Sequence, residues 1–168
     1  MGAQAVMGQG GIEFFHGPFA KAQNEAEATG KLIFMDAYAE WCGPCKYMAR
    51  HSFTDGQVGE LFNKSFVNLK MDMEKGEGPR LARIYRVRAY PTLFILNAEG
   101  EILEKVVGGI GPEPLYEWAY EAIEKHAPHL LKEAEPEPME EAPQGNIFDD
   151  GQEGDVFANP FGGEETVV

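Results

Sequence analysis

The chain has 168 residues, with 43 % hydrophobic and 25 % charged residues, a length and composition typical of one soluble globular domain. Its formal net charge of −14 argues against nucleic acid or an anionic membrane surface as a partner. Its apolar runs are all shorter than the roughly 18 residues that a membrane helix needs, so we expect no membrane insertion.

The charge is concentrated at one end of the chain. Residues 1–132 hold 17 acidic and 14 basic side chains, a net charge of −3, whereas residues 133–168 hold 11 acidic side chains and no basic one. Residues 132–168 are also rich in Pro and Gly, so they bury too little apolar surface to offset the entropy of ordering. We predict a flexible leader over residues 1–10, one domain over residues 11–131 and a disordered acidic tail after it.

The leader has neither a basic residue nor an apolar stretch of signal-peptide length, so it is not a complete signal peptide. It does contain Ala3-Gln4-Ala5, a pattern found at signal cleavage sites. Two interpretations stay open: an upstream export segment that has been removed, and a flexible leader of small residues.

The domain opens with two predicted strands on either side of a helix. Residues 11–15 (GIEFF) predict a short strand. Residues 18–30 predict a helix that begins at Pro18 and ends at Gly30. Residues 31–39 (KLIFMDAYA) form a nearly continuous apolar run, which is typical of a strand buried on both faces.

The rest of the domain predicts two helices, a strand, a short basic helix, two strands joined as a hairpin and a closing amphipathic helix. These elements cover residues 44–53, 55–65, 66–73, 78–87, 91–97, 101–109 and 113–126. The side chains expected to face the core are Val58, Leu61 and Phe62 in the second of these helices and Leu81, Ile84 and Tyr85 in the third. The element order predicts an α/β fold, with a mixed sheet flanked by helices on both faces.

The segment AEWCGPCKYM holds the only two cysteines, Cys42 and Cys45. A structural zinc site needs four ligands, so two histidines would have to join these sulfurs. The four histidines are His16, His51, His126 and His129. None of them has the paired spacing of a zinc site, so we expect no metal. A structural staple is also disfavoured, because closing so short a loop removes little chain entropy. Redox chemistry is the remaining interpretation.

The local geometry favours a redox pair. Pro44 suits the first turn of a helix, and residues three apart on a helix lie about 5–6 Å apart at Cβ, close to disulfide reach. Cys42 then lies at the helix N-terminus, where the helix dipole and free N–H groups can lower a cysteine pKa from ~8.5 into the range of roughly 3.5–7.5. Cys45, one turn further on, would be shielded and able to attack a mixed disulfide at Cys42.

The segment MDAYAEWCGPCK resembles the active-site segment of the thioredoxin family. The tripeptide YPT before an apolar strand is similar to that family's cis-proline segment, and Gly108-Gly109 is similar to its late glycine pair. The resemblance covers roughly residues 11–127 and implies a thioredoxin fold. Residues 53–78 look closer to thioredoxin-like proteins of the bacterial cell envelope than to the cytosolic carrier.

The resemblance also implies a role for Asp36. An acid in the middle of the most apolar predicted strand is either turned to solvent or buried beside the cysteines. Asp36 matches thioredoxin's buried acid, and burial should raise the pKa of such a carboxyl group. Its implied role is to accept the proton of Cys45 through water. Thioredoxin's lysine near this acid aligns with Asn68, so we expect the charge partner of Asp36 to be missing.

The remaining implied site residues contact the substrate. The resemblance implies a cis peptide bond before Pro91, which would present the backbone of Tyr90 to an extended substrate chain. Trp41 is either a packed aromatic or, as the resemblance favours, part of an exposed contact surface. The implied substrate-binding residues are Trp41, Gly43, Pro44, Tyr90 and Pro91.

The resemblance therefore predicts a thiol–disulfide oxidoreductase that reduces protein disulfides and needs no cofactor beyond a dithiol recycling partner. We expect a monomer. The alternatives are a disulfide oxidase or isomerase of the same fold and a non-enzymatic scaffold or chaperone. The two cysteines alone fit either compartment, because a chain whose only thiols are catalytic can be cytosolic or exported. The envelope-like segment and Ala3-Gln4-Ala5 lead us to expect a periplasmic location, with the cytoplasm as the alternative.

Overall fold

The protein is described by a computed structural model over residues 10–132. The predicted leader and acidic tail, including Ala3-Gln4-Ala5, lie outside these residues apart from Gly10 and Lys132. The strands are β1 (Leu32–Tyr38), β2 (Phe66–Asp72), β3 (Thr92–Leu96) and β4 (Ile102–Val107). The helices are α1 (Phe19–Thr29), α2 (Gly43–Arg50), α3 (Gly56–Ser65), α4 (Gly78–Ile84), α5 (Pro112–His126) and a short 3₁₀ helix, Pro128–Leu131.

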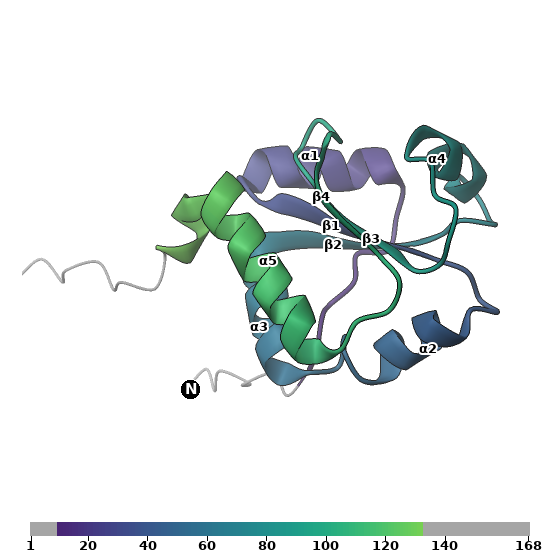
Figure 1. Cartoon of the computed structure of the whole chain (residues 1–168). Coiled ribbons are helices and arrows are strands. Elements are labelled where there is room, and N and C mark those ends of the chain that lie inside the picture. Colours follow the sequence, from purple (N-terminus) through teal and green to yellow (C-terminus); the bar gives the residue numbers. More distant parts are fainter. Residues whose placement is uncertain (1–9, 133–168) are drawn as a thin grey trace, which may run out of the picture. The chain divides into compact units, whose positions relative to one another are not determined.

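The four strands form one mixed sheet in the order β2-β1-β3-β4. β1 pairs with β2 in parallel and with β3 in antiparallel, and β3 pairs with β4 in antiparallel. Helices α1 and α4 cover one face of the sheet, while α2, α3 and α5 cover the other (Figure 1). The predicted mixed sheet with helices on both faces is confirmed, and with it the thioredoxin-like architecture.

β1 is buried on both faces, as its apolar run predicted. Ile33 and Met35 pack with α1 and α4, whereas Phe34 packs with α2, α3 and α5. Because side chains alternate along a strand, Asp36 lies on the same face of the sheet as Phe34, the face that α2, α3 and α5 cover. This alternation places one carboxyl group inside the core.

Local sequence signals set the helix ends. α1 follows Pro18 and ends at Gly30, whose φ of 72° is the left-handed conformation that favours glycine. The β3–β4 hairpin turns at Gly100, where φ is 88°. The described part of the chain has no helix with the length and hydropathy needed to cross a bilayer.

The strand predicted at residues 11–15 is wrong. This segment makes only one isolated bridge, between Phe15 and Leu69. Ile12 N and Phe15 N donate to the backbone carbonyl oxygens of two different segments, those of Phe53 and Asn68. Between them a side-chain amide binds the backbone: Asn63 Oδ1 accepts from Glu13 N at 2.8 Å, and Asn63 Nδ2 donates to the Gly11 carbonyl oxygen at 3.1 Å. A repeating backbone pairing therefore does not form.

The inward position predicted for Ile84 is also wrong. Leu81 and Tyr85 are buried, but Ile84 is 57 % exposed. α4 ends at Ile84, and the core-facing positions of this short helix, Leu81 and Tyr85, are four residues apart. Val58, Leu61 and Phe62 of α3 are buried as predicted.

Candidate active site

The candidate site lies at one edge of the sheet, where β1 and β2 end and β3 begins. The register pairs Tyr38 of β1 with Asp72 of β2, and it pairs Thr92 of β3 with both Ala37 and Val107. The loops that join these strand ends therefore meet. They are residues 39–42, 73–77, 85–91 and 108–111.

The Cys-x-x-Cys motif begins α2 directly after the first of these loops. The Cys42 N–H donates to the Ala39 carbonyl oxygen at 3.2 Å and closes the turn after β1. Cys42 has the extended backbone of a helix N-cap, and Pro44 lies in the first turn. The Sγ atom of Cys42 accepts a hydrogen bond from Cys45 N at 3.2 Å. The predicted disulfide between Cys42 and Cys45 is present, with the Cα atoms 5.3 Å apart.

The two cysteines differ in position rather than in exposure. Cys42 is 2 % and Cys45 5 % exposed. Cys42 caps the helix, where unpaired N–H groups and the helix dipole favour a negatively charged sulfur, whereas Cys45 lies one turn inside. Cys42 itself is almost fully covered, whereas its chain neighbours Trp41 and Gly43 are exposed.

Two other loops, residues 85–91 and 108–111, lie beside the motif. The Tyr90–Pro91 peptide bond is cis, which confirms that expectation. Gly108 has a left-handed φ of 102° and donates its N–H to the Pro91 carbonyl oxygen at 2.8 Å. A Cβ on Gly109 would lie 3.3 Å from the Cβ of Pro44, so the missing side chain lets the β4–α5 loop pass close to α2.

An exposed and a half-buried aromatic ring, those of Trp41 and Tyr90, lie beside Cys42. Trp41 is 66 % exposed, in agreement with the expected surface position. Its ring meets that of Tyr90 edge-on, with the centroids 5.8 Å apart. Substrate contact by these two side chains stays a prediction.

Asp36 is buried in β1, with 1 % of the residue exposed. Neither of its carboxylate oxygens has a hydrogen-bond partner among the described residues. Burial in this apolar setting raises the pKa of Asp36 from 3.8 to about 7, and the charge of Lys70 opposes the rise. A carboxyl group with this pKa can both accept and release a proton near neutral pH.

The expectation that Asp36 has no charge partner is wrong. Lys70 Nζ lies 3.9 Å from Asp36 Oδ2. The β1–β2 register explains the difference, because it pairs Asp36 with Lys70 and places Asn68 opposite Phe34 instead. Asn68 uses its amide to hold residues 11–15, donating to the Glu13 carbonyl oxygen at 3.4 Å.

Three aromatic rings hold the Lys70 side chain. Its ammonium nitrogen lies 4.8 Å from the ring centroid of Tyr38, 5.4 Å from that of Phe14 and 5.5 Å from that of Phe53. Lys70 and Cys45 both line a surface pocket of about 270 Å³. This pocket connects solvent to the side of the motif that carries the inner cysteine.

Other polar residues near the motif do not join it. Lys46 on α2 and His51 just after it are exposed, and the His51 ring packs against the Tyr47 ring. Within residues 10–132, groups of three or more Cys, His, Asp or Glu side chains that could hold a metal are absent. Sequence reasoning missed Lys70 and also Glu74, which contacts Trp41; neither has a local signal.

The solved structures most informative for this chain share its fold. The solution structure of a Bacteroides thetaiotaomicron protein, described as a candidate disulphide isomerase, is 43 % identical in sequence. Its TM-score is 0.62, over 68 % of this chain and 95 % of that one. A structure described as a DsbH oxidoreductase has a TM-score of 0.59 at 17 % identity, over 74 % of this chain and 94 % of its own, and shows similarity of fold alone.

Sequence comparisons likewise find thioredoxins and thiol:disulfide interchange proteins. Residues 16–94 match the family Thioredox_DsbH, described as a protein of unknown function, DUF255. Thioredoxin C-3 of Corynebacterium nephridii is 34 % identical over 93 residues, which are 55 % of this chain and 59 % of the relative. The thiol:disulfide interchange protein DsbD of Vibrio cholerae is 32 % identical over 94 residues, 54 % of this chain and 16 % of the relative. The match thus covers less than two thirds of the length of each of these curated relatives.

Proposed function

The chain belongs to the thioredoxin-like family of thiol–disulfide oxidoreductases, and on this premise we propose that it reduces protein disulfides through Cys42 and Cys45. One observation carries the proposal: Cys42 caps α2 and is bonded to Cys45, which shares a pocket with Lys70, the ion-pair partner of the buried Asp36. This arrangement supplies a nucleophile, a resolving thiol and a base.

In the first step, the Cys42 thiolate attacks one sulfur of the substrate disulfide. The Cys42–substrate S–S bond forms, the substrate S–S bond breaks, and the other substrate sulfur leaves as a thiolate that takes a proton from water. The N-terminal end of α2 stabilises the attacking thiolate, since Cys45 N already donates to Cys42 Sγ at 3.2 Å in the oxidised protein.

In the second step, Cys45 resolves the mixed disulfide. Its thiol proton passes to the Asp36 carboxylate through water, and the Cys45 thiolate attacks Cys42 Sγ. The Cys42–Cys45 bond forms and the second substrate sulfur leaves as a thiolate that becomes protonated. Asp36 then releases its proton to water. Overall the substrate gains two electrons from the cysteine pair, and its two new thiols take their protons from the solvent. A dithiol partner then reduces Cys42–Cys45 by the reverse exchange.

Two loops and the start of α2 form the proposed substrate surface, with the residues Trp41, Gly43, Pro44, Tyr90 and Pro91. The exposure of Trp41 and Gly43 and the half-buried position of Tyr90 support it. An extended substrate chain beside Tyr90 could pair with its backbone as an added strand. The proposed partners are therefore protein disulfides and a dithiol reductant, with the protein acting as a monomer and without a cofactor.

We infer a periplasmic location. The similarity to DsbD of Vibrio cholerae and the envelope-like segment 53–78 support it. Fractionation of the native cells tests this inference: recovery of the protein in the periplasmic fraction supports it, and recovery with the cytosolic fraction contradicts it.

The direction of electron flow is tested by the reduction potential of the cysteine pair, measured against glutathione buffers. A potential near or below about −230 mV supports a reductase, whereas about −180 mV or higher supports an oxidase or isomerase. The isomerase alternative has a specific observation in its favour, since the 43 % identical Bacteroides protein is described as a candidate disulphide isomerase.

Trapping variants test the proposed roles of the sulfurs. In Cys45→Ser the mixed disulfide cannot be resolved, so we expect a covalent complex with a protein disulfide substrate. The matched Cys42→Ser variant should form little of it. Retention of full cellular function in a variant lacking both cysteines would instead indicate a scaffold or chaperone.

A further inference from the structure

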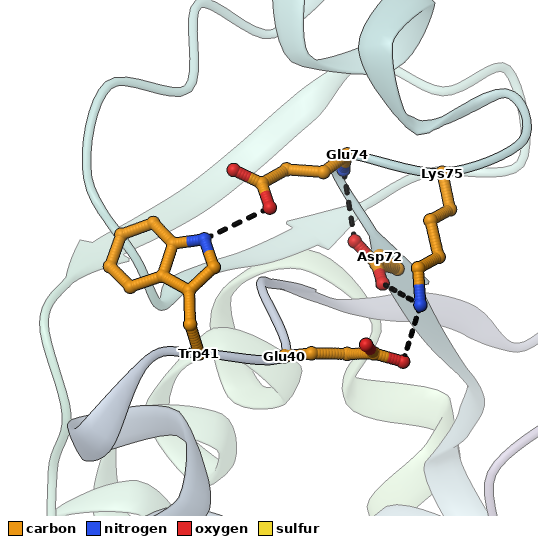
Figure 2. Close-up of polar contacts among 5 residues, drawn as sticks. All are labelled: Glu40, Trp41, Asp72, Glu74 and Lys75. Carbon is orange, nitrogen blue, oxygen red and sulfur yellow. Dashed lines mark hydrogen bonds and ion pairs between the residues drawn. The ribbon is translucent and has the colours of Figure 1, made fainter.

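The loop between β2 and α4, residues 73–77, lies beside Trp41 and has no role in the steps above. Glu74 Oε2 in this loop accepts a hydrogen bond from Trp41 Nε1 at 2.9 Å. The next residue, Lys75, forms an ion pair with Glu40 at 2.6 Å between Nζ and Oε1. Figure 2 shows both contacts: two consecutive residues before Cys42 meet two consecutive residues of the β2–α4 loop.

The backbone that carries Glu74 is itself held in place. Asp72 Oδ1 accepts from the Glu74 backbone N–H at 2.9 Å (Figure 2), and Met73 N donates to the Tyr38 carbonyl oxygen at 2.9 Å. Gly76 completes the turn with a left-handed φ of 57°. The Glu74 carboxylate therefore projects from an ordered turn that is tied to both β1 and β2.

The Trp41 indole is thus held from two sides. Glu74 binds its N–H group, and the Tyr90 ring packs edge-on against it at 5.8 Å. An exposed tryptophan without such contacts samples several rotamers, and a partner that packs on it must restrict that freedom when it binds. Here the two contacts restrict it beforehand, while 66 % of the residue remains exposed.

We propose that Glu74 is a positioning residue that holds the Trp41 indole as a preformed wall of the substrate groove beside Cys42. The inference rests on the proposed function, because it assumes that a protein substrate packs on Trp41. Since Glu74 occupies the indole N–H, the wall offers a substrate only aromatic surface. The substrate class that fits is an extended polypeptide with an apolar side chain next to its disulfide.

The test compares steady-state reduction of insulin disulfides by the unmodified protein and by three variants, with dithiothreitol as the reductant. Glu74→Ala removes the acceptor, Glu74→Gln keeps an acceptor oxygen without the charge, and Glu124→Ala removes an exposed carboxylate on α5 as the matched control. For Glu74→Ala we expect KM to rise roughly three- to tenfold, or about 0.6–1.4 kcal/mol at 1.4 kcal/mol per tenfold. We expect kcat to change less than twofold, and Glu74→Gln and Glu124→Ala to keep KM within about twofold of the parent.

A double-mutant cycle shows whether Glu74 acts through the indole. If it does, Glu74→Ala has no further effect on KM in a Trp41→Ala background. An equal rise in KM in both backgrounds would overturn the proposal, as would an unchanged KM in Glu74→Ala. The chain has two tryptophans, so the indole N–H NMR signal of Trp41 is identified by its loss in Trp41→Ala. We expect it to shift in Glu74→Ala and to exchange faster with water.

Failure of this inference can be told apart from failure of the proposed function. If the unmodified protein reduces neither insulin nor the small disulfide cystine, the proposed function is wrong. If it reduces insulin but Glu74→Ala leaves KM unchanged, only the role of Glu74 is wrong. The reduction potential supplies a second readout, because a general disturbance of α2 would move it and a loss confined to the Trp41 wall would not.

Discussion

Replacing Lys70 by methionine should shift the pH dependence of the resolving step. Lys70 lies 3.9 Å from Asp36 and is the one charge that lowers the raised pKa of this carboxyl group, about 7. Methionine keeps an unbranched chain over the rings of Tyr38, Phe14 and Phe53 and removes the charge. The ionised form of Asp36 therefore loses stabilisation while the packing is largely kept.

The expected magnitude follows from the distance. Two unit charges about 4 Å apart interact by about 1 kcal/mol in water and about 4 kcal/mol at an effective dielectric constant of 20. The Lys70 side chain is 25 % exposed, so solvent screening favours the lower part of this range, about 1–2 kcal/mol. This corresponds to a roughly five- to thirtyfold change in the protonation equilibrium. At pH 7 the ionised fraction of Asp36 would fall from about one half to roughly one sixth or less.

The assay is the rate of mixed-disulfide resolution as a function of pH, measured by stopped-flow mixing with a protein disulfide. If ionised Asp36 is the base, the midpoint moves to higher pH in Lys70→Met, and Lys70→Arg, which keeps the charge, stays close to the parent. Lys105→Met is the matched control, since Lys105 of β4 also lies over an aromatic ring, 5.5 Å from the ring centroid of Phe94 in β3. The same midpoint in Lys70→Met and the parent would refute the role of the pair.

Three further predictions concern stability. Burial raises the pKa of Asp36 from its ordinary value of 3.8 to about 7. The free energy of unfolding should therefore be highest below about pH 4 and fall as the pH rises to 7, because the unfolded chain loses this proton first. Asp36→Asn should abolish this decline, and urea unfolding at pH 8 should show it to be more stable than the parent by about 3–5 kcal/mol. Phe34 is fully buried among the rings of Phe53 and Phe62, so Phe34→Ala should cost about 3–5 kcal/mol in the same measurement, and a loss below 1 kcal/mol would contradict this packing. A Cβ on Gly78 would collide with the Asp72 carbonyl oxygen, whereas one on Gly56 would meet nothing; Gly78→Ala should therefore lower Tm by several degrees, and Gly56→Ala should not.

Several features of the fold follow from short stretches of sequence. Pro18 and Gly30 bound α1 because the first fits the start of a helix and the second the left-handed conformation after its end. The nearly continuous apolar run of β1 favours cover on both faces, as a layered α/β arrangement supplies it. The position of Cys42 at a helix N-terminus follows in the same way from the motif and Pro44.

Other features depend on how distant segments pair. Residues 11–15 have the composition of a strand, but amide side chains of Asn63 and Asn68 hold them without a ladder. Their apolar pattern carries no information about these partners. Ile84 has a helical spacing from Leu81, yet α4 ends there and leaves it exposed. In both cases a local pattern was interpreted without its tertiary partner.

The sequence by itself determined the chemistry of the site: two cysteines at the start of a helix, an acid in a buried strand and a proline before the next strand. These features depend on neighbouring residues, whose spacing sets helix caps and the alternation of side chains. The tertiary structure alone decided which charges surround that chemistry. Lys70 rather than Asn68 meets Asp36 because the β1–β2 register pairs them, and Glu74 meets Trp41, 33 residues away, because parallel strands end at the same edge of the sheet. Such contacts depend on the register between strands, which no local spacing encodes.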